Sequence, residues 1–175
     1  RFLSEHGLPS YDAELLTSRK DVADYFDGAV KIHNNPKALS NWIVGDLFRV
    51  LKERKLDDQL YIENWPISAQ HLAELVQLID QGKINGKIAK SVFEAMLDGD
   101  KTPRQIVSEK GLEQVSDSGS IETAVDQVLA ANAKQVEQYR SGNDKVFRFI
   151  VGQIMKATQG KANPQKVNEI LREKL

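Results

Sequence analysis

The 175-residue sequence contains no cysteine and three histidines. The absence of cysteine excludes disulfides, thiolate zinc sites and cysteine nucleophiles, and it suits a reducing compartment. No uninterrupted apolar run approaches the roughly 20 residues of a membrane span. The chain also has almost no net charge, with a value of -1. Taken alone, this near-neutral charge argues against a nucleic-acid-binding protein. These absences favour a globule held together by its apolar core.

What the sequence does contain supports that view. Hydrophobic residues make up 41% of the chain, which is enough for a folded core. A chain of this length forms one domain or two small ones. The sequence begins at Arg1, and no charged-then-apolar signal segment follows it. We therefore expect a fragment of a longer protein.

Apolar residues recur at helical spacing nearly throughout, and this pattern predicts an all-α fold. Asparagine or serine caps, proline at first helical positions and glycine at helix ends set the expected boundaries. One short extended piece is possible at Leu60–Ile62, before Pro66. The expected helices are 11–17, 19–33, 36–55, from 68 to about 81, from 85 to about 98, 103–111, 120–131, 132–142, 144–159 and from 164 onward.

Two small helical bundle domains are expected. Residues 111–120 are small, polar and rich in serine and glycine, which is typical of a linker. The sequence therefore predicts a helical connecting domain over 1–112 and a basic helical tail domain over 113–175.

No catalytic or metal site is assigned. The three histidines lie far apart in the sequence, and no two of them have the short spacing of a metal-binding pair on one helix. Residues 82–88 resemble a phosphate loop only superficially, since the glycine spacing is short and Ile88 replaces the required hydroxyl; a turn between helices is expected. Asp98–Asp100 lacks the other EF-hand ligands. Asp57 and Asp58 are best explained as a solvated loop. The fragment is expected to be non-catalytic alone.

One helix separates basic from apolar residues. At about 100° per residue, Lys145, Arg148, Gly152 and Lys156 share one face, and Phe149 borders it. The opposite face carries Phe147, Ile150, Val151 and Ile154. Glycine inside a helix costs about 1 kcal/mol against alanine, so Gly152 suggests close approach by something bulky. An aromatic side chain such as Phe149 could stack on a base.

The near-zero net charge conceals an uneven distribution. Residues 141–175 carry a net charge of +4 and the remaining residues carry -5. Three explanations of the basic face stay open: an ordinary solvated helix surface, contact with an RNA backbone, or docking to an acidic protein surface.

A family resemblance extends over essentially the whole chain. Residues 149–164, Phe-Ile-Val-Gly-Gln-Ile-Met-Lys-Ala-Thr-Gln-Gly-Lys-Ala-Asn-Pro, closely resemble the C-terminal signature of the B subunits of aspartyl/glutamyl-tRNA amidotransferases, within the GatB/YqeY family. Shorter matches occur at 8–13, 41–43, 72–75, 111–117 and 136–139. Gln159 departs from the pattern, since many members have a basic residue there.

The resemblance implies part of a heterotrimeric, cytoplasmic bacterial enzyme of protein biosynthesis. Such enzymes convert misacylated Glu-tRNA(Gln) or Asp-tRNA(Asn) by ATP-dependent transamidation, with glutamine as amido donor. The implied partners are tRNA(Gln) or tRNA(Asn) and the A and C subunits of the amidotransferase, with no membrane. ATP and Mg²⁺ are implied for an N-terminal catalytic domain, and no cofactor is expected in this fragment. The implied role of the fragment is to grip the tRNA.

The motif and the helical wheel together give eight candidate tRNA-binding residues. Lys145 and Arg148 come from the wheel, and the signature contributes most of the others. The set is Lys145, Arg148, Phe149, Gly152, Gln153, Lys156, Lys161 and Asn163. The alternative function is a protein–protein docking module without direct RNA contact.

Overall fold

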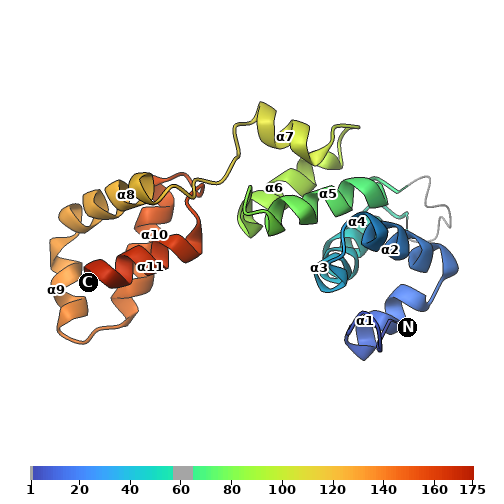
Figure 1. Ribbon diagram of the computed structural model, residues 1–175, viewed down its shortest axis with the longest axis horizontal. Coiled ribbons are helices and arrows are strands. Elements are labelled where there is room, and N and C mark those ends of the chain that lie inside the picture. The colour runs from blue at the N-terminus through green and yellow to red at the C-terminus, as the bar shows by residue number, and fades with distance from the viewer. Residues whose placement is uncertain (1, 57–64) are drawn as a thin grey trace. The chain divides into compact units, whose positions relative to one another are not determined.

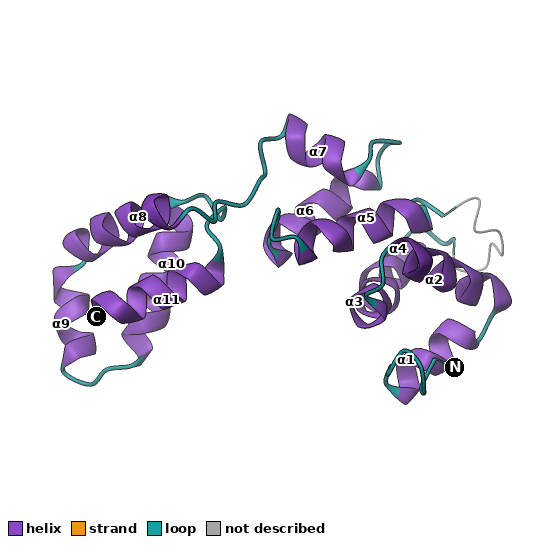
Figure 2. Ribbon diagram, in the orientation of Figure 1, coloured by secondary structure: helices purple, strands orange, loops and turns teal. Residues whose placement is uncertain are grey.

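The computed structural model describes residues 2–56 and 65–175 (Figures 1 and 2). Within those ranges every regular element is helical, and extended pairing is limited to one parallel β-bridge between Val115 and Ala162. The all-α prediction is confirmed. The possible extended piece at Leu60–Ile62 lies outside the described residues.

The chain divides into two compact units. Unit 1 comprises Arg1–Asp80 and Val92–Val107, and unit 2 comprises Gln81–Ser91 and Ser108–Leu175. Both units are therefore discontinuous in sequence. The division 1–112 and 113–175 stays a prediction.

Unit 1 is built on a helical stretch from Pro36 to Glu53, close to the predicted 36–55. The Asn35 side chain caps it by accepting a hydrogen bond from the Ala38 amide at 3.2 Å. A π-helical segment, which the sequence did not predict, interrupts its middle. The elements of this unit are α1 (Ser10–Thr17), α2 (Lys20–Ile32), α3 (Pro36–Asn41), η1 (Trp42–Leu47), α4 (Phe48–Glu53), α5 (Ala69–Asp80), the C-terminal part of α6 (Gly86–Met96) from Val92 on, and most of α7 (Pro103–Glu109).

The core of unit 1 forms where α2 packs against α5. Trp42 is buried, and its ring lies 5.3 Å from the Phe93 ring between centroids, so it packs against a neighbouring helix. The Tyr25 hydroxyl donates to the Ile67 carbonyl at 2.9 Å. Burial raises the pKa of Tyr25, because the phenolate would lose its hydration.

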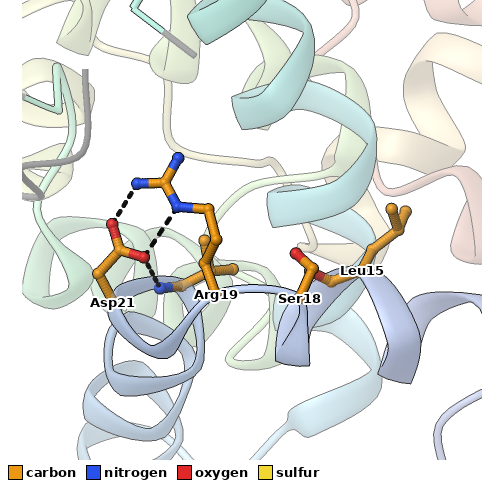
Figure 3. Close-up of polar contacts among 5 residues, drawn as sticks. Leu15, Ser18, Arg19 and Asp21 are labelled. Atoms are coloured by element: carbon orange, nitrogen blue, oxygen red, sulfur yellow. Dashed lines mark hydrogen bonds and ion pairs between the residues drawn. The ribbon is translucent and has the colours of Figure 1, made fainter. Parts of the chain in front are cut away.

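A sharp turn joins α1 to α2 and is fixed by side chains (Figure 3). The Ser18 hydroxyl donates to the Leu15 carbonyl at 2.7 Å. The Arg19 guanidinium pairs with the Asp21 carboxylate, which also accepts from the Val22 amide at 3.0 Å. The hydrogen bond from Arg19 holds the pKa of Asp21 below its usual value.

Unit 2 is a small bundle centred on α10, which packs against three other helices (Figure 1). Its elements are α8 (Ser118–Ala131), α9 (Ala133–Arg140), α10 (Lys145–Ala157) and α11 (Pro164–Lys174). Its core consists of Ile121, Val125, Val128, Val146, Ile150, Ile154, Ala162, Val167 and Leu171.

The predicted linker over 111–120 is wrong at its C-terminal end. Helix α8 begins at Ser118, so Gly119 and Ser120 belong to its first turn. The Asp117 carboxylate accepts from the Ser120 amide at 2.8 Å, and this cap lets the helix start inside a serine- and glycine-rich run.

The first turn of α6 (Gly86–Met96) also belongs to unit 2. The buried Asn85 side chain caps it by accepting from the Ile88 amide at 2.9 Å. The same amide group donates to the Gly160 carbonyl at 2.9 Å, 75 positions further along. Gly82 has a φ of 66°, which favours glycine. The predicted turn between helices is confirmed, and it covers 81–85 because α6 begins at Gly86.

The Asp117 cap leads to a prediction about acid stability. Hydrogen bonds from Ser120, the backbone amide first, lower the pKa of Asp117 from its usual 3.8. Because the pKa is lower in the folded state, the ionised carboxylate stabilises the folded chain when the pH is above the usual pKa. This contribution disappears as the pH falls through the folded-state pKa.

We expect Asp117→Ala to lower the Tm by a few degrees at pH 7. Asp117→Asn keeps a cap, and its Tm should depend less on pH below 5. Superimposable Tm profiles of the wild type and Asp117→Asn would contradict this account.

Candidate functional site

Helix α10 presents two distinct faces. Val146, Ile150 and Ile154 are buried at a spacing of four residues, which places them on one side of the helix. They belong to the core shared with α8 and α11. The fully buried Ile150 and Ile154 therefore determine which face of α10 is left outside.

The opposite face is the basic stripe, made of Lys145, Arg148, Gly152 and Lys156. All four residues are exposed. Across 2–56 and 65–175, no carboxylate lies within 4.0 Å of any of these three cations. The wheel predicted the orientation of this helix, and the burial of its residues confirms it. The charge of the stripe remains available to a ligand.

Lys174 provides a contrast within the same unit. Its ammonium lies 2.5 Å from the Asp126 carboxylate and 2.9 Å from Glu122. The hydrogen bond to Asp126, then that to Glu122, raises the pKa of Lys174. These acids neutralise Lys174 locally, so it adds little to the electrostatic field around the molecule, whereas no described acid pairs with the cations of the stripe.

Gly152 lies at the centre of the stripe, in open space. A Cβ atom added there would meet no heavy atom within 4 Å apart from its two chain neighbours and the nearby backbone of its own helix. No packing in unit 2 therefore requires glycine at this position. The helix carries a residue of poor helical propensity where close approach from outside is possible.

Two further candidates on α10 differ in exposure. Phe149 borders the stripe and is 45% exposed, which is unusual for so large an apolar side chain in a folded unit. Gln153 is half-buried. Phe149 therefore offers a surface for stacking, and Gln153 is less accessible.

Lys161 and Asn163 lie on the turn between α10 and α11. Lys161 is half-buried, and its carbonyl accepts from the Val115 amide at 2.7 Å. The Asn163 side chain accepts from the Gln165 amide at 2.9 Å and from the Lys166 amide at 3.2 Å. Its oxygen is thus used to cap α11. This cap agrees with the helix start expected at Pro164, and it gives Asn163 a structural function.

Lys87, which the sequence pattern did not single out, lies beside this turn. Its ammonium would lie 3.6 Å from a Cβ atom built on Gly160. Gly160 has a φ of 75°, and its carbonyl is held by Asn85. Lys87 is exposed and belongs to unit 2, so it adds a cation near the signature turn. No sequence signal connects residues this far apart.

The two units differ in charge. Counted from the sequence, unit 1 carries -5 and unit 2 carries +4. Residues 81–91 contribute three lysines and no acid to unit 2. Such a field attracts an anionic ligand to unit 2, and salt weakens the attraction because the charges are exposed.

Metal-binding clusters and membrane-spanning helices are not found in the described residues. No group of three or more His, Cys, Asp or Glu that could hold a metal ion occurs within 2–56 and 65–175. Among the helices described, none is long and apolar enough to cross a membrane.

Fold and site together define an all-helical protein whose basic stripe has no acidic partner among the described residues and whose same unit carries an exposed aromatic side chain. The family model described as the GatB domain matches residues 24–175. The chain belongs to the GatB/YqeY family.

Curated relatives match the whole chain. It is 51% identical to part of the B subunit of the aspartyl/glutamyl-tRNA(Asn/Gln) amidotransferase of Geotalea daltonii and 52% identical to that of Trichlorobacter lovleyi. Identity to the corresponding protein of Carboxydothermus hydrogenoformans is 46%. In each case the alignment covers 100% of this chain and 36% of the relative. The chain thus spans about a third of the length of these relatives, and it corresponds to their C-terminal portion.

Proposed function

We propose that the chain binds tRNA through the basic stripe of α10. The observation that carries the proposal is a group of three cations around an open Gly152, with no acidic partner in the part of the chain that the structure describes. From Lys145 to Lys156 the stripe extends about 16 Å, at 1.5 Å per residue. This length suits contact with several successive phosphates, and Phe149 could stack on an unpaired base beside them. A folded RNA with phosphates and unpaired bases matches both features.

Support for a wider role comes from the relatives, which are named B subunits of the aspartyl/glutamyl-tRNA(Asn/Gln) amidotransferase. In this proposal the chain positions misacylated Glu-tRNA(Gln) or Asp-tRNA(Asn) for transamidation, together with the A and C subunits of such an enzyme, in the bacterial cytoplasm. Chemistry that needs ATP and Mg²⁺ is assigned to the rest of the protein. In this proposal the chain contributes affinity for the tRNA and holds the tRNA in the orientation that transamidation needs.

The test is tRNA affinity as a function of salt concentration. Each phosphate neutralised by a lysine adds about 0.7–0.9 to the negative slope of log K against log salt. We expect a steep slope for the wild type and a slope smaller by about one for Lys156→Gln. Filter binding or fluorescence anisotropy between about 50 and 300 mM salt measures both.

The matched control is Lys134→Gln, because Lys134 is exposed on α9. It removes the same charge away from the stripe. A salt-independent affinity, or equal slopes for the two variants, would contradict the proposal. Capture of the A or C subunit that survives ribonuclease but is lost in Lys156→Gln would favour the docking alternative.

A further inference from the structure

A second feature of unit 2 lies next to the basic stripe. A pocket of about 270 Å³ is lined by Tyr139 from α9, Asp144, Phe147 and Arg148 from α10 and its cap, and Arg172 from α11. The volume is slightly below that of typical small-molecule sites, about 300–1,000 Å³. It therefore suits one planar group better than a complete ligand.

Two aromatic rings are among the groups that line this pocket. The Tyr139 and Phe147 rings lie 5.9 Å apart between centroids, at 43° to each other. The Arg172 guanidinium carbon lies 5.8 Å from the Phe147 centroid, within cation–π range. The ring arrangement keeps the exposed Arg172 near the pocket, and no acid among residues 2–56 and 65–175 pairs with it.

The polar groups of the pocket are also available. Asp144 is the N-cap of α10, yet its side chain makes no capping hydrogen bond. Within the described residues its carboxylate forms no ion pair with Arg148 or Arg172, although all three line the same pocket. The pocket thus combines two guanidinium donors with one carboxylate acceptor.

A pocket with two guanidinium donors and one carboxylate acceptor favours some classes of ligand over others. Asp144 makes the pocket less favourable for a phosphate or an acidic peptide than two guanidinium groups alone would be. Guanine presents the O6 and N7 acceptors that an arginine fork matches. It also carries N1–H and N2–H donors, which a carboxylate accepts. Its ring would stack on Tyr139 or Phe147.

We propose that this pocket holds one unpaired guanine of a bound RNA. The proposal rests on the proposed function and deepens it, because the stripe would hold the backbone while the pocket takes a base. Arg172 and Asp144 would contact the edges of the base, and Arg148, shared with the stripe, would lie between base and backbone.

The test uses the full 175-residue chain and two RNA hairpins of equal charge. One hairpin carries a single bulged guanosine and the other an abasic nucleotide at the same place. We expect the wild type to bind the guanosine hairpin about tenfold more tightly. Arg172→Lys keeps the charge but loses the planar fork, and it should reduce this ratio to about two. Asp144→Asn should raise affinity for the abasic hairpin while lowering the ratio.

Arg140→Lys is the matched control, since Arg140 is exposed on α9 and does not line the pocket. It should keep the tenfold ratio. Salt-sensitive but equal binding of both hairpins by the wild type would overturn the guanine pocket and leave the proposed function standing. A failure to bind either hairpin or tRNA would overturn both. Equal binding with displacement by an acidic peptide would overturn the proposal in favour of a protein partner.

Discussion

Truncation of Ile154 to alanine is expected to lower the free energy of unfolding of unit 2 by about 2–5 kcal/mol. Ile154 is fully buried in a core of nine residues. Its removal would leave a cavity that neighbours on α8 and α11 can fill only partly. A bundle this small buries a limited share of its surface, so the loss is a large fraction of its total stability.

Urea denaturation followed by circular dichroism measures this effect. Ile32→Ala is the matched control, because Ile32 is 53% exposed on α2 and loses the same atoms. That variant should change stability by no more than about 0.5 kcal/mol. Equal losses for the two variants would mean that the core around α10 is not packed as described. RNA affinity should fall with unfolding in Ile154→Ala, since the same helix carries the stripe.

Substitutions at Gly152 are expected to move stability and binding in opposite directions. Gly152→Ala should stabilise the chain by up to about 1 kcal/mol, because alanine is the better helix former and its Cβ meets nothing. RNA affinity should nevertheless fall, since the methyl group occupies the space through which a backbone approaches. Gly152→Glu adds an opposing charge between Arg148 and Lys156 and should weaken binding tenfold or more.

Thermal melting and tRNA binding at fixed salt measure the two effects on the same samples. Ala130→Glu adds the same charge at an exposed position of α8 and should change affinity far less. If Gly152→Ala stabilised the chain and left affinity unchanged, close approach at this position would be excluded. A role for the stripe as an ordinary solvated surface would then be the better explanation.

Prediction from the sequence succeeded where helical periodicity determines which side chains are buried and which are exposed. The positions of Ile150 and Ile154 orient α10, so the exposure of Lys145 and Lys156 follows from a spacing of 3.6 residues. Motif resemblance led to the family, which the match over 24–175 shows. Both arguments depend on short-range patterns within one or two helices.

Features that depend on tertiary contacts could not be predicted. Nothing near Asn85 in sequence indicates that its amide reaches the Gly160 carbonyl. The pocket beside the stripe needs Arg172, which lies on another helix than Phe147. The start of α8 at Ser118 depends on one cap by Asp117, and propensity alone disfavours a helix through Gly119.

The hydrogen bond from Asn85 to Gly160 also bears on the order of folding. During synthesis Asn85 leaves the ribosome 75 residues before its acceptor. The first turn of α6 can form with its own cap at once, but unit 2 can close only after the turn following α10 has emerged. Contacts between such distant positions raise contact order and slow folding. We therefore expect closure of this hydrogen bond to be a late event, when nearly the whole chain is available.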